Sequence, residues 1–290
     1  AGQSGNLSGV YWNPASIASY NGIGVQFGSY DWLVAMKYQF AIIGIDLGAK
    51  GVLGLSIVNL SSPDDLVRTV SEPQGTGEKF STNDLSASLT YSKMLTDHFS
   101  LGGSFKYIQQ NIWHSTAHTV AIDIGTLFQT PFYGTRLGAS ISNYGGKMKM
   151  DGRDQKISID PDLDNQGNVE FVNAIYETEH FPLPLFFRVG VSGELIKKQN
   201  LKLSYGIDAL HPNDNTEHLN LGLELNYREI LFLRGGIPSF YKMDSIEGPT
   251  FGAGLNYHMT RTATLLKIDY SFSSYGPLGD VERLSIGFNF

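Results

Sequence analysis

The sequence predicts an all-β fold, a 14-stranded antiparallel transmembrane β-barrel. Short runs in which apolar and polar residues alternate recur along the chain, and residues 283–290 are a clear example. No run of 18 apolar residues exists, although 41% of the residues are hydrophobic, so a transmembrane helix is excluded. The connections between the runs alternate between short and long, which is typical of barrels in the outer membrane.

Fourteen candidate strands follow from the alternation of apolar and polar residues. Most have the length that a tilted strand needs to cross the hydrocarbon, and the even number fits a single-chain barrel. The expected strands are 22–29, 36–47, 51–60, 85–94, 100–110, 118–129, 135–143, 185–196, 201–210, 217–227, 230–237, 250–258, 262–272 and 281–290.

The loops place the two ends of the barrel. Every second connection is short, and the four long ones, 61–84, 144–184, 238–249 and 273–280, fall in the other set. We therefore expect both termini on the periplasmic side and the long loops outside the cell. A signal peptide is expected upstream of residue 1.

The last strand carries the expected barrel-assembly signal. Leu284, Ile286, Phe288 and Phe290 share one face, and the chain ends on the aromatic residue. A final strand of this kind is typical of outer-membrane barrels. We assign Phe288 and Phe290 to the signal. Aromatic residues near the strand ends, among them Tyr30 and Trp32, are expected in girdles at the membrane interfaces, or as ordinary strand aromatics.

Charged residues are expected to point into the lumen, because the other face of each strand is apolar. Their signs are mixed, which favours cross-barrel networks and a narrow or plugged interior over a strongly selective ion pore. The predicted lumen network comprises Lys106, Asp123, Arg136, Arg188, Glu194, Lys202, Asp208, Glu224, Arg234, Lys267, Asp269 and Arg283.

The net charge of −7 lies in the two longest loops, with −3 in 61–84 and −4 in 144–184. An acidic outer face argues against nucleic acid as a partner. Asp160, Asp162 and Asp164 alternate as in a calcium loop, but Asn165 stands where such a loop needs glycine. Ca²⁺ or a solvated acidic turn are both open readings; no other cofactor is expected.

An apolar stretch follows in the same loop. Phe171, Val172, Ile175 and Tyr176 either fold back onto the barrel rim or bind a protein partner. Catalytic signatures such as a nucleophile elbow, a His-Glu-x-x-His helix or a P-loop do not occur. The chain is therefore not expected to be an enzyme, and its lack of cysteine leaves no disulfide framework.

The segment before the first strand is too short and too broken by proline to span a membrane. It contains Trp12, Asn13, Pro14 and Ala15 and is expected at the periplasmic mouth or inside it. We divide the chain into a hatch or plug segment, 1–20, and a barrel, 21–290.

The motif Tyr-Trp-Asn-Pro-Ala-x-x-Ala at residues 11–18, with residues 30–32, 106–108 and 137–143, resembles the PorV/PorQ-like outer-membrane proteins, relatives of the FadL channels. The chain departs from the family at Ser16 and Ile17, and it lacks the preceding glycine-rich stretch. The resemblance implies a FadL-like barrel with an amino-terminal hatch. It also implies a role in protein secretion or cell-surface attachment, as in type IX secretion.

Three functions remain open at this point. The first is a partner-binding barrel of secretion or surface attachment. The second is a FadL-like channel for hydrophobic or amphiphilic small molecules with a lipid-like ligand, and the third is a structural subunit of a larger envelope assembly.

Overall fold

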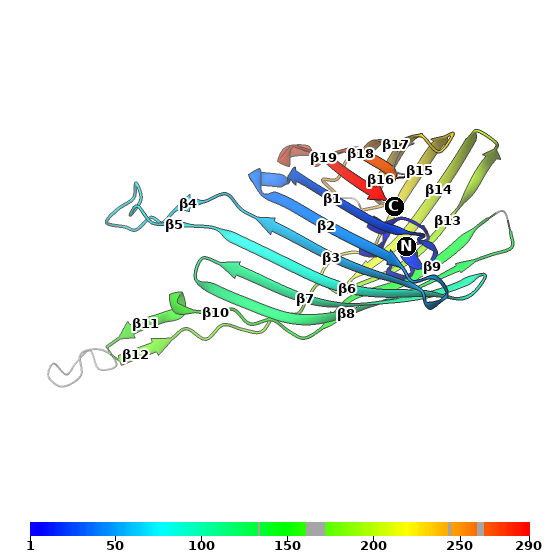
Figure 1. Ribbon diagram of the computed structural model, residues 1–290. Coiled ribbons are helices and arrows are strands. Elements are labelled where there is room, and N and C mark those ends of the chain that lie inside the picture. The colour runs from blue at the N-terminus through cyan, green and yellow to red at the C-terminus, as the bar shows by residue number, and fades with distance from the viewer. Residues whose placement is uncertain (133, 161–171, 243–244, 260–263) are drawn as a thin grey trace.

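The computed structural model describes all residues except 133, 161–171, 243–244 and 260–263. In this part of the chain, fourteen antiparallel strands pair in sequence and close into a barrel (Figure 1). The predicted fold class and each of the fourteen predicted strands are confirmed. The barrel strands are β1 (Ile23–Asp31), β2 (Lys37–Asp46), β3 (Val52–Ser61), β6 (Thr82–Thr96), β7 (Phe99–Ile112), β8 (Ser115–Gln129), β9 (Arg136–Gly145), β13 (Phe186–Lys198), β14 (Leu201–Pro212), β15 (His218–Tyr227), β16 (Leu231–Phe240), β17 (Thr250–Met259), β18 (Thr264–Ser274) and β19 (Asp280–Asn289).

The first and last strands close the sheet. Val25 of β1 is paired with Phe288 of β19, and the amide of Phe290 donates a hydrogen bond of 2.8 Å to the carbonyl of Ile23. Closure leaves no strand edge in the wall, so the backbone groups of the wall are paired within the sheet.

The outer face of the wall is apolar. In β8, Val120, Ile122 and Ile124 are 48%, 47% and 55% exposed, whereas Ala121 and Asp123 between them are 1% exposed. Aliphatic side chains this exposed, arranged as a belt around a closed sheet, require lipid as their solvent. None of the helices among the described residues is long and apolar enough to cross a bilayer.

Strands β6, β7 and β8 are longer than the alternation predicted. β6 has 15 residues and β7 has 14, and both extend at the outer end. The missed residues at these outer ends include Asn83 and Asn111, whose polar side chains interrupt the alternation. Because these strands exceed the 9–11 residues needed to cross the hydrocarbon, we place their ends beyond the bilayer.

Two long loops project from the end of the barrel that lies away from the termini (Figure 1). One holds the short pair β4 (Asp65–Leu66) and β5 (Lys79–Phe80), and the other holds β10 (Asp151–Gly152) and the pair β11 (Lys156–Ile159) and β12 (Val172–Ile175). The second loop also returns into the barrel mouth, where Met148 and Leu183 pack on Ala117 and Ala121 of the inner face of β8.

Short 3-10 helices occupy the turns and the amino-terminal segment. That segment forms η1 (Leu7–Tyr11) and η2 (Pro14–Ser19); the others are η3 (Leu33–Ala35), η4 (Gly48–Lys50), η5 (Arg153–Gln155) and η6 (Gly276–Leu278). Each of the first two begins with an asparagine, Asn6 and Asn13, whose side chain accepts a backbone hydrogen bond. This is the usual way to satisfy the first free amides of a helix.

Candidate functional site

Residues 1–20 lie inside the barrel, and we call them the hatch. Leu7, Val10 and Ile17 pack on Ile42 of β2 and Val52 of β3, and all five are buried. The next segment of the hatch, η2, packs on β6, β7 and β8. One side of the barrel wall is therefore covered from within.

Asn13 fixes the hatch to the wall. Its side chain is fully buried, and its amide nitrogen donates to the carbonyl of Ala1 at 2.9 Å and to the carbonyl of Thr126 in β8 at 3.0 Å. Its Oδ1 accepts the amide of Ala15 at 2.9 Å. The two polar atoms of this side chain thus make three hydrogen bonds in a buried position, where a polar group left unpaired costs about 1–3 kcal/mol.

Glycines in the wall make room for this contact. A Cβ at Gly125 would overlap Oδ1 of Asn13, and a Cβ at Gly102 would overlap the backbone of Pro14 and Ala15. Both positions face the lumen, and without a side chain there the hatch lies directly on the backbone of the wall. A larger residue at either position is incompatible with the hatch in its present place.

Serine hydroxyls of the wall complete the attachment. Ser140 of β9 donates to the carbonyl of Trp12 at 2.8 Å, and Ser192 of β13 donates to the carbonyl of Gly2 at 2.7 Å. Asp208 of β14 lies 2.6 Å from the amino nitrogen of Ala1. The hatch thus bonds to strands on both sides of β13.

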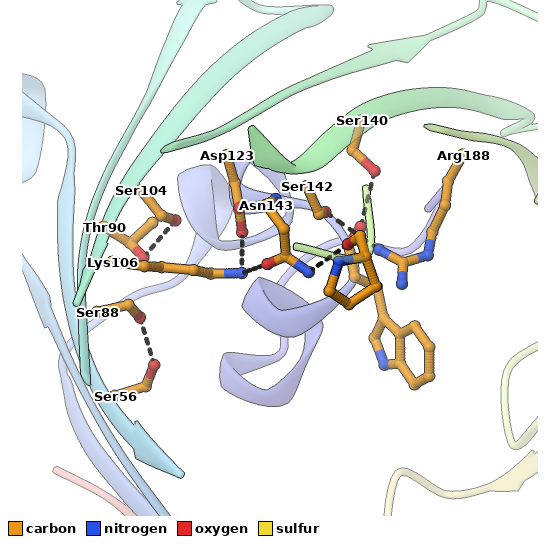
Figure 2. Close-up of polar contacts among 12 residues, drawn as sticks. Ser56, Ser88, Thr90, Ser104, Lys106, Asp123, Ser140, Ser142, Asn143 and Arg188 are labelled. Carbon is orange, nitrogen blue, oxygen red and sulfur yellow. Dashed lines mark hydrogen bonds and ion pairs between the residues drawn. The ribbon is translucent and has the colours of Figure 1, made fainter. Parts of the chain in front are cut away.

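A buried ion pair lies in the covered side of the wall (Figure 2). Nζ of Lys106 is 2.5 Å from Oδ2 of Asp123 and donates to Oδ1 of Asn143 at 3.0 Å. Asp123 also accepts the backbone amide of Asn143 at 2.8 Å. Asn143 has a φ of 65° and lies where the pairing of β8 and β9 shifts by one residue. The Asp123 carboxylate therefore accepts a backbone amide that has no carbonyl partner on the neighbouring strand.

Arg188 of β13 lies close by and is 5% exposed. Its guanidinium donates to Oγ of Ser142 at 3.1 Å and stacks on the rings of Trp12 and Phe186, at 5.5 and 4.9 Å from their centroids. No carboxylate of the described residues lies within 4.0 Å of it. Arg188 thus holds the Trp12 ring by a desolvated cation–π contact.

Hydroxyl pairs link neighbouring strands on the same covered side. Ser56 and Ser88 lie 2.6 Å apart, and Thr90 and Ser104 lie 2.7 Å apart (Figure 2). Thr90 is 1% exposed. Sequence reasoning expected hydrogen-bonded networks in the lumen but did not identify these pairs, because it named only the charged inward residues.

The opposite side of the wall, from β14 to β18, is open to the lumen. Here Arg234 of β16 bridges Glu224 of β15 at 2.7 Å and Asp269 of β18 at 2.5 Å, and the three side chains are 36%, 29% and 31% exposed. Inward positions also include Gly206 and Gly222, where an added Cβ would meet no side chain within 4 Å. Solvent therefore reaches the inner face of this side of the barrel.

The remaining predicted lumen residues are not joined into one network. Lys202 pairs with Glu229 of the next turn at 2.7 Å, and Glu194 pairs with Lys197 at 2.9 Å. Arg136 and Lys267 have no carboxylate partner among the described residues. The structure thus divides the predicted network into two ion clusters, two turn pairs and separate cations.

Arg283 lies in an aromatic cluster at the outer end of β19. Its guanidinium is 5.4 Å from the Tyr30 ring and 5.3 Å from the Trp32 ring, and it donates to Oγ of Ser273 and to the hydroxyl of Tyr275. The sequence left open whether Tyr30 and Trp32 belong to an interface girdle or are ordinary strand aromatics. Tyr30 lies at an inward position of β1, and both rings contact Arg283, which favours the second reading.

The outer-loop predictions are only partly covered by the described residues. Val172, Ile175 and Tyr176 are 45%, 64% and 64% exposed and lie at β12. Phe171, Asp162 and Asp164 lie outside the described residues, so both the full apolar stretch and the calcium loop stay predictions. In the part of the chain that is described, no group of three or more acidic or histidine residues is arranged for a metal.

Another cluster in this loop was not predicted. Asp154 of η5 accepts the backbone amide of His114 at 3.1 Å and lies 2.8 Å from its Nδ1, while Arg153 contacts Nε2 of the same ring. The contact ties the loop 144–184 to the tip of the β7–β8 hairpin. Nothing in the local sequence pairs positions 40 residues apart, so only the fold reveals it.

Comparison with solved structures shows channels of the same fold. The Ralstonia pickettii toluene transporter TbuX matches with a TM-score of 0.58 and 12% identity, over 99% of this chain and 94% of that one. The Pseudomonas putida toluene transporter TodX matches with a TM-score of 0.56 and 12% identity, over 99% and 93%. A TodX deltaS2S3 mutant, a monoaromatic hydrocarbon channel, matches with a TM-score of 0.60 and 12% identity, over 98% and 95%.

These matches establish the FadL-like type of the barrel, and at 12% identity they carry the fold alone. No protein-family model matches the sequence, and no curated protein matches it. The narrower resemblance to PorV/PorQ proteins stays a prediction.

Proposed function

We propose that this protein is a channel of the bacterial outer membrane for small hydrophobic or amphiphilic molecules. The fold it shares with toluene transporters and a monoaromatic hydrocarbon channel supports this function. The proposal includes termini in the periplasm and long loops outside the cell, since long outer loops are typical of such barrels. The hydrocarbon-channel function thus replaces secretion as the leading proposal. No feature of the site calls for catalysis.

One observation carries the proposal. The hatch covers the wall on one side only, where inward residues such as Ser92 and Thr90 are 0% and 1% exposed. On the side from β14 to β18 the inward charged groups are about one-third exposed. From this difference we infer a passage beside the hatch, polar on the barrel wall and bordered by the hatch residues Tyr11 and Trp12, which are 53% and 49% exposed. A surface with one polar and one aromatic side suits an amphiphile.

The passage can be tested by filling it. Gly206 points into it with no atom within 4 Å of an added Cβ, so Gly206→Trp adds a large ring to open space. We expect the flux of a small amphiphile such as benzyl alcohol into proteoliposomes, measured above the flux into protein-free liposomes, to fall in this variant. The matched control is Gly235→Trp, because Gly235 also has open space around it but lies between inward-facing Arg234 and Gly236 and therefore faces lipid.

The two variants separate a block of the passage from a loss of folding. Equal flux in Gly206→Trp and the parent protein, with both barrels folded, would remove the passage beside the hatch from the account. Equal loss of flux in both variants would point to damage of the wall.

The outer loop favours a second candidate function, partner binding in secretion or surface attachment. Ile175 and Tyr176 are 64% exposed; Ile175 ends β12 and Tyr176 follows it, and β12 belongs to a two-stranded ribbon that stands away from the barrel (Figure 1). Apolar side chains in such a position suit a protein partner. A structural subunit of an envelope assembly would use the same surface.

Removal of residues 151–179 tests this candidate. Among the described residues of that range, only the two-residue β10 is paired with a barrel strand, so the shortened protein is expected to fold and to conduct. If the loop binds a partner, affinity purification from native membranes will recover that partner with the full chain and lose it with the shortened one. Equal recovery from both would contradict the docking role.

A further inference from the structure

Charge in the lumen is not balanced locally. Asp123, Glu194, Glu224 and Asp269 each lie within 3 Å of a basic side chain, and Asp208 contacts the nitrogen of Ala1 at 2.6 Å. Every predicted lumen carboxylate is therefore partnered.

Several lumen cations have no such partner. Among the described residues, Arg136, Arg188, Lys267 and Arg283 have no carboxylate within 4.0 Å. Cations without a counter-charge in a narrow, partly desolvated passage produce a positive potential that attracts anions.

Arg283 is the member of this set that combines accessibility with aromatic surroundings. It is half-buried, and two hydrogen bonds, of 2.8 Å to Ser273 and 3.2 Å to Tyr275, leave donors of its five N–H groups free. The rings of Tyr30 and Trp32 lie against its guanidinium, and Tyr30 is stacked on Tyr38 with 4.9 Å between the ring centroids.

The hatch adds aromatic surface to the lumen. Tyr11 and Trp12 contact each other edge to face at 4.9 Å and are both about half exposed. The centroid of the Trp12 ring also lies 5.5 Å from the guanidinium of Arg188 in β13. The exposed hatch rings therefore border the lumen beside the β13 wall.

We infer that the outer half of the lumen binds aromatic acids, with Arg283 receiving the carboxylate and the rings of Tyr30 and Trp32 receiving the arene. A guanidinium offers paired N–H groups to a carboxylate, and ring faces prefer offset or edge contacts with another ring. An aromatic acid uses both features together, whereas a neutral arene uses only the rings and an aliphatic acid only the charge. This inference rests on the proposed channel function and specifies its substrate class.

The test is calorimetric binding of benzoate, benzyl alcohol and octanoate to the full chain in detergent, alongside flux of the same solutes into proteoliposomes. We expect benzoate to bind at least about tenfold more tightly than either of the others. Arg283→Gln should abolish the preference over benzyl alcohol. Arg228→Gln, which removes an arginine stacked at 5.4 Å on Tyr227 in an inner turn, should leave it unchanged.

Trp32→Leu provides a second variant if Arg283→Gln fails to fold. It keeps the charge and removes a ring, so benzoate binding should weaken to the level of octanoate. Equal binding of the three solutes, or unchanged benzoate binding in Arg283→Gln, would overturn the inference.

Flux separates the inference from the proposed function. Passage of benzyl alcohol without selective benzoate binding would leave the channel standing and remove the aromatic-acid site. Arg283-dependent benzoate binding without flux of any solute would support the site and contradict the channel.

Discussion

Nζ of Lys106 lies 2.5 Å from Oδ2 of Asp123, and this ion pair holds the wall where β9 carries an extra residue. The same carboxylate accepts the amide of Asn143 at the shift in pairing. A charge pair thus takes the place of a ladder hydrogen bond in a wall that must leave no backbone group unpaired in lipid.

Asp123→Asn should destabilise the barrel strongly. Asp123 is 1% exposed and Lys106 only 16%, so the variant leaves a largely buried ammonium without its counter-charge. Breaking one side of a buried pair costs about 3–5 kcal/mol. Urea unfolding in phospholipid measures the change. Asp65→Asn, which breaks an exposed pair with Arg68, should change the free energy of unfolding by less than about 0.5 kcal/mol. Similar effects of the two variants would contradict this role.

Asn13→Ala should loosen the hatch and leave the wall intact. The variant removes the acceptor of the Ala15 amide and the donor to two buried carbonyls, at a cost of about 1–3 kcal/mol for each buried group left unpaired. Chymotrypsin cleavage after Tyr11 or Trp12 should therefore be faster by at least about fivefold. The exposed Asn21 supplies the control, since Asn21→Ala removes a bond of 3.3 Å at the surface. Unchanged cleavage in Asn13→Ala would show that other contacts hold the hatch.

Gly125→Ala should displace the hatch, whereas Gly206→Ala should not. Both glycines lie in strands and face the lumen, but only at Gly125 would the new methyl overlap the Asn13 side chain. Thermal unfolding should show a lower Tm for Gly125→Ala and an equal or higher Tm for Gly206→Ala. An equal Tm for Gly125→Ala and the parent would mean that the hatch does not rest on this part of β8.

The attachment of the outer loop to the β7–β8 hairpin should depend on pH. Partial desolvation acts to raise the pKa of Asp154, but hydrogen bonds from His114 and the charges of His114 and Arg153 outweigh it and hold that pKa below its ordinary value. The stabilisation is therefore complete above about pH 4, where the unfolded carboxyl is ionised, and is lost as the pH falls through the folded pKa.

Hydrogen exchange of residues 146–156 measures this dependence. Protection should fall below about pH 4 as the Asp154 carboxylate is protonated, and Asp154→Asn should remove this fall. A loss of protection centred near pH 6 would assign the dependence to another group.

Much of the fold followed from the period-2 alternation, because lipid outside and polar groups inside impose opposite demands on successive residues. The alternation also placed Glu224, Arg234 and Asp269 on inward faces, where the structure joins them. It did not reveal which inward residues the hatch covers. Thr90 and Glu224 both lie at inward positions, but Thr90 is 1% exposed and the Glu224 side chain is 29% exposed.

Sequence reasoning could not predict contacts between distant segments, because these contacts depend on how the folded segments pack. The bonds of Asn13 to Thr126 and of Asp154 to His114 depend on where the hatch and the outer loop pack. Asn143 offered a local signal, since asparagine tolerates a positive φ better than most residues, but only the pairing of β8 with β9 shows the extra residue.

The most direct measurement is labelling of a single cysteine in the passage, which is straightforward because the chain has no cysteine of its own. Gly222→Cys places a thiol on the open side, and Ser92→Cys places one at an inward position that is 0% exposed. If a passage runs beside the hatch, a membrane-impermeant thiol reagent will label Gly222→Cys from either side of a proteoliposome and leave Ser92→Cys unlabelled. Labelling of Gly222→Cys from one side only, or from neither, would contradict a passage beside the hatch.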